Sequence, residues 1–206
     1  MHALLKLSRG IDWLNSLVGK YVIWLILAST VISGVNAVVR KAFNYSSNGF
    51  LEVQWYLFAA AFLLAAGYTL LQGEHVKVDV IASRLSKRAQ IWIDIFGFVF
   101  FLTPVCLVIL WYGIPFFIQG YVSNEMSSNA GGLIRWPVYL MMPLGFGLLL
   151  LQGMSELIKR IAFLQGLIED PTAKKAEKTA EEELAESIRR LAQASKGNGA
   201  SAHTAE

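Results

Sequence analysis

Four long segments without a charged side chain constrain this chain more than any other feature. They are 19, 21, 30 and 20 residues long and comprise Tyr21–Val39, Val53–Gly73, Ile95–Asn124 and Trp136–Ser155. A helix needs about 20 apolar residues to cross the roughly 30 Å hydrocarbon core of a bilayer. We therefore predict four membrane-spanning helices, near residues 20–40, 51–73, 91–114 and 136–159.

The distribution of charge separates these segments from a polar tail. Charged residues make up 16% of the chain, against about 25% in a soluble domain. Residues 165–206 alone hold six basic and eight acidic side chains. A soluble globule of this size cannot bury so much apolar surface, and no basic stripe suits nucleic acid. The prediction is an all-α membrane protein with a polar, partly disordered cytoplasmic tail, residues 161–206.

The third segment is longer than one crossing requires. Gly113 and Pro115 predict that its helix ends there, which leaves Phe116–Asn124 at the outer interface. Pro104 lies within the same helix and predicts a kink, which packing in a bundle tolerates.

An amphipathic pattern precedes the first span. Apolar residues recur at helical spacing within residues 4–18, while Asp12 and Asn15 lie on other faces. We predict that residues 1–19 form a separate helix along the cytoplasmic headgroups, in contact with membrane lipids. Residues 79–90 fit either a shorter interfacial helix or the start of the third span.

Lysine and arginine in the connections predict the orientation, because cytoplasmic loops of membrane proteins are enriched in both. The side that includes the N-terminus, the second loop and the end of the fourth span carries nine of them: Lys6, Arg9, Lys20, Lys77, Arg84, Lys87, Arg88, Lys159 and Arg160. The other side carries Arg40, Lys41 and Arg135. Both termini are expected to be cytoplasmic.

Carboxylates lie at the ends of the spans and not in their interiors. Glu52 opens the second span, Asp94 lies near the start of the third and Glu156 near the end of the fourth. A proton-coupled carrier needs a carboxylate nearer mid-depth, so transport by this chain alone is not expected. Glu52 is either a helix-start carboxylate at the outer interface, or an anchor for a basic group such as Arg40 or one on a partner.

The sequence contains little that predicts catalysis or metal binding. Cys106, the only cysteine, lies in an apolar run and is expected to be a buried structural thiol. Glu74, His75 and Asp79 share one loop, but without a second cluster they are a weak metal signal; a polar clasp at the cytoplasmic surface is the alternative. We expect no enzyme and no cofactor.

Two regions resemble the small membrane subunit of TRAP (tripartite ATP-independent periplasmic) transporters, the DctQ family. LEVQWYLFAAAFLLAAGYTLLQGEHVKVD (Leu51–Asp79) is similar to the family pattern at Glu52, Gly73, His75, Val76, Val78 and Asp79. GGLIRWPVYLMMPLGFGLLLLQGMSELIK (Gly131–Lys159) has the family's W-P entry, M-P-L-G step and L-Q-G-x-x-E exit. The resemblance covers about residues 10–160 and leaves the tail without a family role.

The resemblance implies a scaffold role in a bacterial inner-membrane importer of organic acids that uses a sodium gradient. A large multi-span subunit would hold the substrate and sodium sites and a periplasmic protein would bind the substrate, while this chain braces the large subunit. Candidate partner-interface residues are Glu52, Trp55, His75, Asp79, Trp136 and Glu156. The outer loop, residues 120–135, either helps to dock the binding protein or is a flexible connection.

Two other functions fit the same pattern of spans. In the first, the chain is a free-standing four-helix membrane carrier. In the second, it is an assembly or sensor protein that binds a cytoplasmic partner through its acidic tail.

Overall fold

The computed structural model describes residues 1–45, 47–73 and 85–168. These residues form α1 (His2–Phe43), α2 (Asn48–Gln72), α4 (Lys87–Gly97), the π-helix η1 (Phe98–Leu102), α5 (Thr103–Val122) and α6 (Trp136–Leu164). Since α4, η1 and α5 run on as one helix, Lys87–Val122, the described part has four helices long and apolar enough to cross a membrane. The predicted all-α membrane fold is confirmed.

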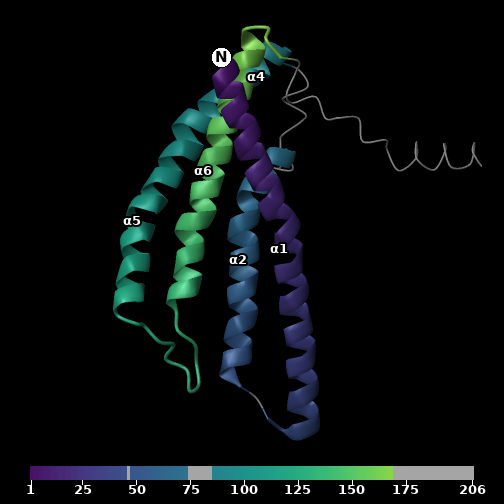
Figure 1. Cartoon of the computed structure of the whole chain (residues 1–206), viewed down its shortest axis with the longest axis vertical. Helices are drawn as coiled ribbons and strands as arrows, with labels where there is room; N and C mark the ends of the chain where they lie inside the picture. The colour runs from purple at the N-terminus through teal and green to yellow at the C-terminus, as the bar shows by residue number, and fades with distance from the viewer. Residues whose placement is uncertain (46, 74–84, 169–206) are drawn as a thin grey trace, which may run out of the picture. The chain divides into compact units, whose positions relative to one another are not determined.

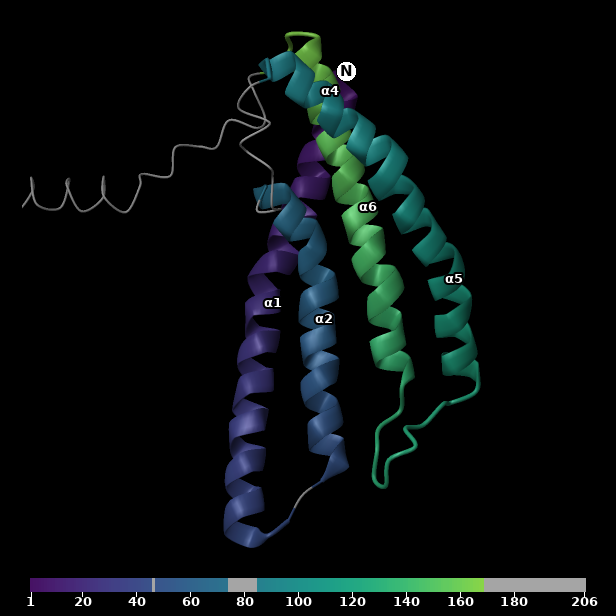
Figure 2. The same cartoon turned by 180° about the vertical axis from the view of Figure 1, so that it is seen from behind.

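Helix α6 is central to the packing of the four helices (Figures 1 and 2). It contacts α1, α2, α4 and α5, and α1 also packs along α2. Residues 85–168 contribute no β-strand, and the loop between α5 and α6 contains one isolated bridge, between Met126 and Ile134. The two ends of α6 therefore determine where polar groups from different helices meet.

Helix α1 is one unbroken helix of 42 residues, so the predicted separate helix over residues 1–19 is corrected. No proline interrupts it. Asp12 and Asn15, which were expected on the polar outer faces, instead contact α6 and bond to Gln152. The amphipathic spacing correctly predicted a helix here, but it did not predict that the polar side of this helix packs against α6.

The third spanning helix also continues beyond its predicted end at residue 114. Helix α5 passes Gly113 and Pro115 and ends at Val122. Gly113 is buried against α6, where an added Cβ would lie 3.3 Å from the sulfur of Met142. One missing N–H at a proline is tolerated within a bundle. The prediction that Gly113 and Pro115 end the helix is therefore wrong. Gly113 instead allows α5 to pack closely against α6.

A π-helix occupies the region in which Pro104 predicted a kink. Within η1 the backbone N–H of Thr103 bonds to the carbonyl of Phe98, five residues earlier. Such a widened turn is a usual way for a helix to absorb an irregularity. The third helix thereby accommodates Pro104 without ending.

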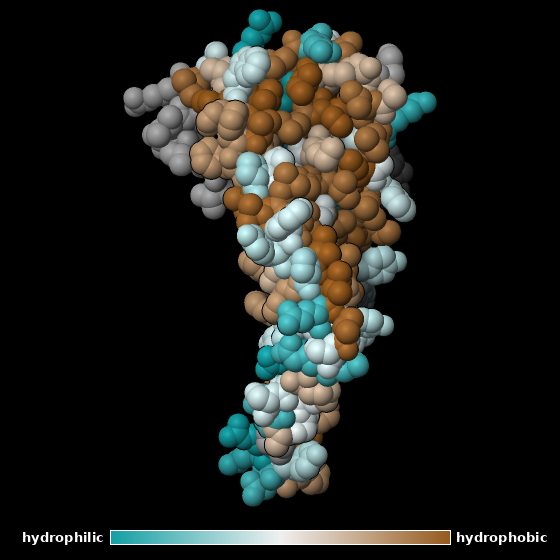
Figure 3. Space-filling view, turned by 90° about the vertical axis from the view of Figure 1, so that its left-hand side faces the viewer, coloured by the Kyte–Doolittle hydropathy of each residue, from teal (hydrophilic) through white to brown (hydrophobic). Residues whose placement is uncertain are grey.

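Apolar side chains cover most of the protein surface shown in Figure 3. Trp111, Tyr112 and Phe62 are each more than 70% exposed. Large apolar side chains exposed on long helices are what a lipid environment requires. Many aromatic side chains therefore face outward, although others, such as Phe116 and Tyr139, pack against each other between α5 and α6.

We predict that Gly145→Ala destabilises the bundle, whereas Gly147→Ala, two residues further along α6, does not. A Cβ at Gly145 would lie 2.6 Å from the backbone oxygen of Leu63 on α2, but one at Gly147 would meet nothing within 4 Å. Overpacking of this kind costs about 1–3 kcal/mol. Thermal unfolding in detergent measures the difference, and equal midpoints for the two variants would contradict the close α2–α6 approach.

Candidate functional site

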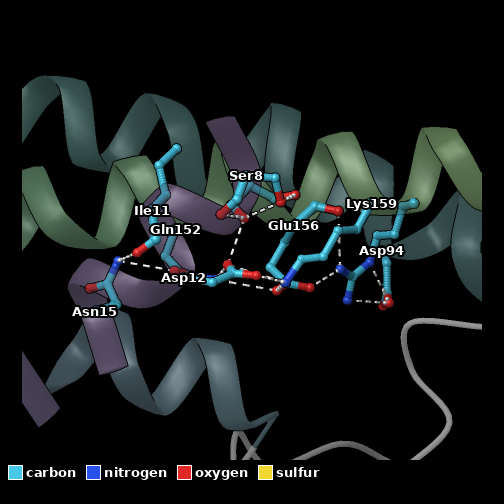
Figure 4. Close-up of polar contacts among 10 residues, drawn as sticks. Ser8, Ile11, Asp12, Asn15, Asp94, Gln152, Glu156 and Lys159 are labelled. Carbon is cyan, nitrogen blue, oxygen red and sulfur yellow. Dashed lines mark hydrogen bonds and ion pairs between the residues drawn. The ribbon is translucent and has the colours of Figure 1, made fainter. Parts of the chain in front are cut away.

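A cluster of polar side chains joins α1, α4 and α6 near the C-terminal end of α6 (Figure 4). We call it the polar cluster, and its members are Ser8, Asp12, Asn15, Asp94, Gln152, Ser155, Glu156, Lys159 and Arg160. The α6 members recur at intervals of three or four residues, which places them on one side of the helix. Ser8, Asp12 and Asn15 follow the same spacing on α1.

Asp12 is the main acceptor between α1 and α6. Its Oδ1 accepts from Ser155 Oγ at 2.7 Å and from Gln152 Nε2 at 2.9 Å, and its Oδ2 lies 3.2 Å from Lys159 Nζ. The hydroxyls of Ser8 and Ser155 lie 2.7 Å apart in the same seam. These bonds fix which side of α1 faces α6.

Asn15 extends this seam toward α2. Its Nδ2 donates to Gln152 Oε1 at 3.0 Å, and both residues are fully buried. Its Oδ1 has no hydrogen-bond partner in the described structure and faces Gly67, where a Cβ would lie 2.2 Å away. Gly67 is thus the residue that allows α2 to pack beside the Asn15 amide.

Arg160 ties α4 to α6. Its Nε donates to Asp94 Oδ2 at 3.0 Å and its Nη1 bonds to the carboxylate of Glu156, which also pairs with Lys159. The guanidinium lies 4.6 Å from the ring centroid of Phe98, the first residue of η1. Since Arg160 and Glu156 are only 5% and 7% exposed, this is a buried ionic network, and removing one partner from such a network is costly.

A second polar site, which we call the loop anchor, lies near the opposite end of α6 and centres on Glu52. The carboxylate of Glu52 accepts the backbone N–H of Leu133 at 2.6 Å and the Asn129 amide at 2.9 Å, and the Ser127 hydroxyl also bonds to it. Glu52 is only 2% exposed. It therefore holds the loop between α5 and α6 and does not pair with Arg40.

Further bonds give this loop a defined conformation. Ser127 N–H donates to the Leu133 carbonyl, and Tyr56 of α2 donates to the Ile134 carbonyl. Glu125 pairs with Arg135 at 3.3 Å and accepts from Tyr139 at 2.8 Å. The loop is thus an ordered element and not a simple flexible connection.

Within residues 1–45, 47–73 and 85–168, no group of three or more His, Cys, Asp or Glu side chains could hold a metal ion. Cys106 is buried, as predicted, and lines a largely apolar groove of about 620 Å³ between α2, α6 and the continuous helix of α4, η1 and α5. Chemically, the two sites can hold helices and a loop in place.

The candidate interface residues separate into different environments. Glu52 and Glu156 are buried in the loop anchor and the polar cluster. Trp55 on α2 is 48% exposed and contacts Tyr56, and Trp136 at the start of α6 contacts Tyr121. His75 and Asp79 lie outside the described residues. The structure thus brings none of the described four together into one site.

Sequence reasoning missed the α1 half of the polar cluster. Asp12 and Asn15 were expected on faces other than the apolar one, in a helix along the headgroups, and Ser8 was not singled out. Their own spacing of four and three residues, matched by that of Gln152, Ser155 and Lys159 on α6, is the signal that pairs the two helices.

Comparison with known proteins gives one match. A family model described as "Tripartite ATP-independent periplasmic transporters, DctQ component" matches residues 29–163. This range includes α2, the loop anchor and the α6 part of the polar cluster. No curated protein and no solved structure gives a significant match.

Replacing the Glu52 carboxylate should loosen the loop. In Glu52→Gln one acceptor oxygen becomes an NH2 group, which faces either the Leu133 N–H or the donors of Ser127 and Asn129. The loop bonds should therefore weaken by about 1–3 kcal/mol. Hydrogen exchange over residues 123–135 should accelerate. Glu125→Gln is the control, because the Glu125 carboxylate is 41% exposed and exposed pairs contribute about 0–1 kcal/mol. Equal acceleration in both variants would contradict the anchor.

Removing the Arg160 cation should destabilise the protein strongly. Arg160→Met leaves Glu156 buried with one cation fewer, a change that costs about 3–5 kcal/mol. Lys159→Met should cost less, since Lys159 is 18% exposed and Arg160 is 6% exposed by side chain. The midpoints of thermal unfolding in detergent compare them. If Lys159→Met were as harmful as Arg160→Met, the Arg160 link to α4 would not be the stronger contact.

Proposed function

The chain belongs to the DctQ family, and from this premise we propose that it is the small scaffold subunit of a sodium-coupled TRAP importer of organic acids. In this proposal it braces the large multi-span subunit that carries the substrate. A periplasmic substrate-binding protein is the third component. DctQ is a family of transporter components and not of enzymes.

The bracing role is supported by the two buried carboxylates, because both are already bonded to other groups of this chain. Glu52 is bonded by three groups of the loop, and Glu156 is paired with Lys159 and Arg160. A carboxylate that binds and releases a coupling ion needs free coordination sites and access, normally within the membrane interior. Fixed pairs at the two ends of the bundle suit a rigid support. We propose that the sodium gradient acts on the large subunit and that this chain uses no cofactor.

The orientation is proposed from charge and the location from the family. We propose that both termini lie in the cytoplasm, because nine of the twelve cations next to the spans lie on that side. As a component of a periplasmic transport system, the chain is proposed to lie in the bacterial inner membrane. The polar cluster is then at the cytoplasmic end of the bundle, and the loop anchor faces the periplasm. Trp55 and Trp136 are proposed contacts for the large subunit, together with His75 and Asp79 at the cytoplasmic exit of the second span.

Co-purification tests this proposal against its alternatives. With the large subunit co-expressed, the chain extracted in mild detergent should carry that subunit with it. Reconstituted alone, the chain should transport no organic acid, whereas a free-standing carrier would. Deleting residues 170–206 should leave uptake intact, whereas a sensor acting through its tail would lose its function. The scaffold proposal fails if no large multi-span protein co-purifies.

The same assay separates the roles of Glu52. Glu52→Ala should lower the yield of the complex. The double variant Ser127→Ala with Asn129→Ala should reproduce the loss if Glu52 acts by positioning the loop. A loss in Glu52→Ala alone would assign the effect to the bond from the Leu133 N–H, which the double variant keeps. An unchanged yield in both would remove the loop anchor from the interface.

A further inference from the structure

Three cations and a tryptophan lie along one side of the N-terminal half of α1. Lys6, Arg9 and Lys20 are exposed, and Trp13 is 66% exposed. At 3.6 residues per turn, their positions fall within about 60° of one another around the helix axis. Within residues 1–45, 47–73 and 85–168, none of the three cations forms an ion pair with a carboxylate. We call these four residues the basic stripe.

The polar cluster determines the direction in which this stripe faces. Ser8, Asp12 and Asn15 lie on another side of the same turns of α1 and are bonded to α6. Turning the stripe toward the bundle would break these bonds and expose buried polar groups to an apolar environment, which is costly. The stripe is therefore held pointing away from α6.

The stripe ends directly before the first apolar segment begins. Lys20 directly precedes Tyr21, the first residue of the charge-free segment Tyr21–Val39. At about 1.5 Å per residue, Trp13, Arg9 and Lys6 follow at roughly 10, 16 and 21 Å from Lys20 along the axis.

The headgroup layer on one side of a bilayer is about 5–8 Å thick. Helix packing places the edge of the apolar layer beside Ser8 and Asp12, because both contact Ser155, the last residue of the fourth charge-free segment. Arg9 and Trp13 are thus level with the headgroups, and Lys6 lies about 5 Å beyond Arg9. Lys20 lies about 10 Å deeper than Trp13, and its long side chain extends back toward the headgroups.

We infer that the basic stripe binds anionic phospholipid headgroups of the leaflet next to Lys20. Lysine and arginine beside a spanning helix are attracted to anionic lipid within about one Debye length of the surface, and an amphipathic tryptophan favours the interface. Among the described residues the three cations form no ion pair with a carboxylate. They have the opposite charge to a lipid phosphate, and they continue directly from the lipid-facing span. These three observations favour lipid over an acidic protein surface.

Native mass spectrometry of the full chain in mild detergent tests the inference. The measured quantity is the ratio of bound phosphatidylglycerol to bound phosphatidylcholine. Replacing all three cations by glutamine should lower this ratio at least about tenfold, since one cation near an anionic surface contributes about fivefold. The single variants should rank by distance from the headgroup level, with Arg9→Gln most harmful. The control keeps every charge: Lys6→Arg, Arg9→Lys and Lys20→Arg.

The outcomes separate this inference from the scaffold role, because lipid binding is measured on the chain alone. An unchanged lipid ratio in the glutamine triple variant overturns the inference and leaves the scaffold proposal intact. If that variant keeps the wild-type ratio but loses the large subunit on co-purification, the stripe is a protein contact and the lipid assignment is wrong. If the charge-retaining control loses lipid equally, geometry and not charge binds the headgroups, which also overturns it.

Discussion

The cost of an unpaired polar group in hydrocarbon governs how this chain is built. No water is available there to satisfy a buried donor or acceptor, so polar side chains on different helices are tolerated where they meet one another. The structure concentrates them in the polar cluster and the loop anchor, near the two ends of α6. Between these sites the helices are joined by close approach at glycines such as Gly145. Hydrogen bonds and ion pairs therefore align the helices at the two ends of α6, and close contacts at glycines determine the distance between helices in the middle.

The polar cluster has consequences beyond the residues it joins. Asp12 and Asn15 fix the rotation of α1 against α6, and Arg160 fixes α4 just before the widened turn at η1. The same cluster thus orients the first helix and stabilises the start of the third. Buried ion pairs often add little net stability, and their best-attested use is to specify one arrangement among several. That property suits a chain whose proposed task is to hold another subunit in place.

The predictability of each feature depended on whether it is local. The four spans follow from charge-free segments, since transfer of apolar residues into lipid needs no knowledge of neighbours. The ends of α1 and α5 did not follow. Whether Asp12 faces water or Gln152, and whether Gly113 ends a helix or admits Met142, depends on residues more than 25 positions away. Likewise, Glu52 was singled out by its position, but its partners lie in the loop about 75–81 residues later.

The burial of Glu52 in the loop anchor is unusual for a carboxylate at the start of a helix. A carboxylate at a helix start is already favoured by the helix dipole, so a surface glutamate there would need no further support. Glu52 instead lies almost fully buried, and the three groups that donate to it all come from one loop. Ordering that loop has an entropic cost. The bonds to Glu52 offset this cost in the chain alone, without a bound partner. A loop ordered in advance loses less freedom on binding than a flexible one, so the anchor favours association at the periplasmic end of the proposed scaffold.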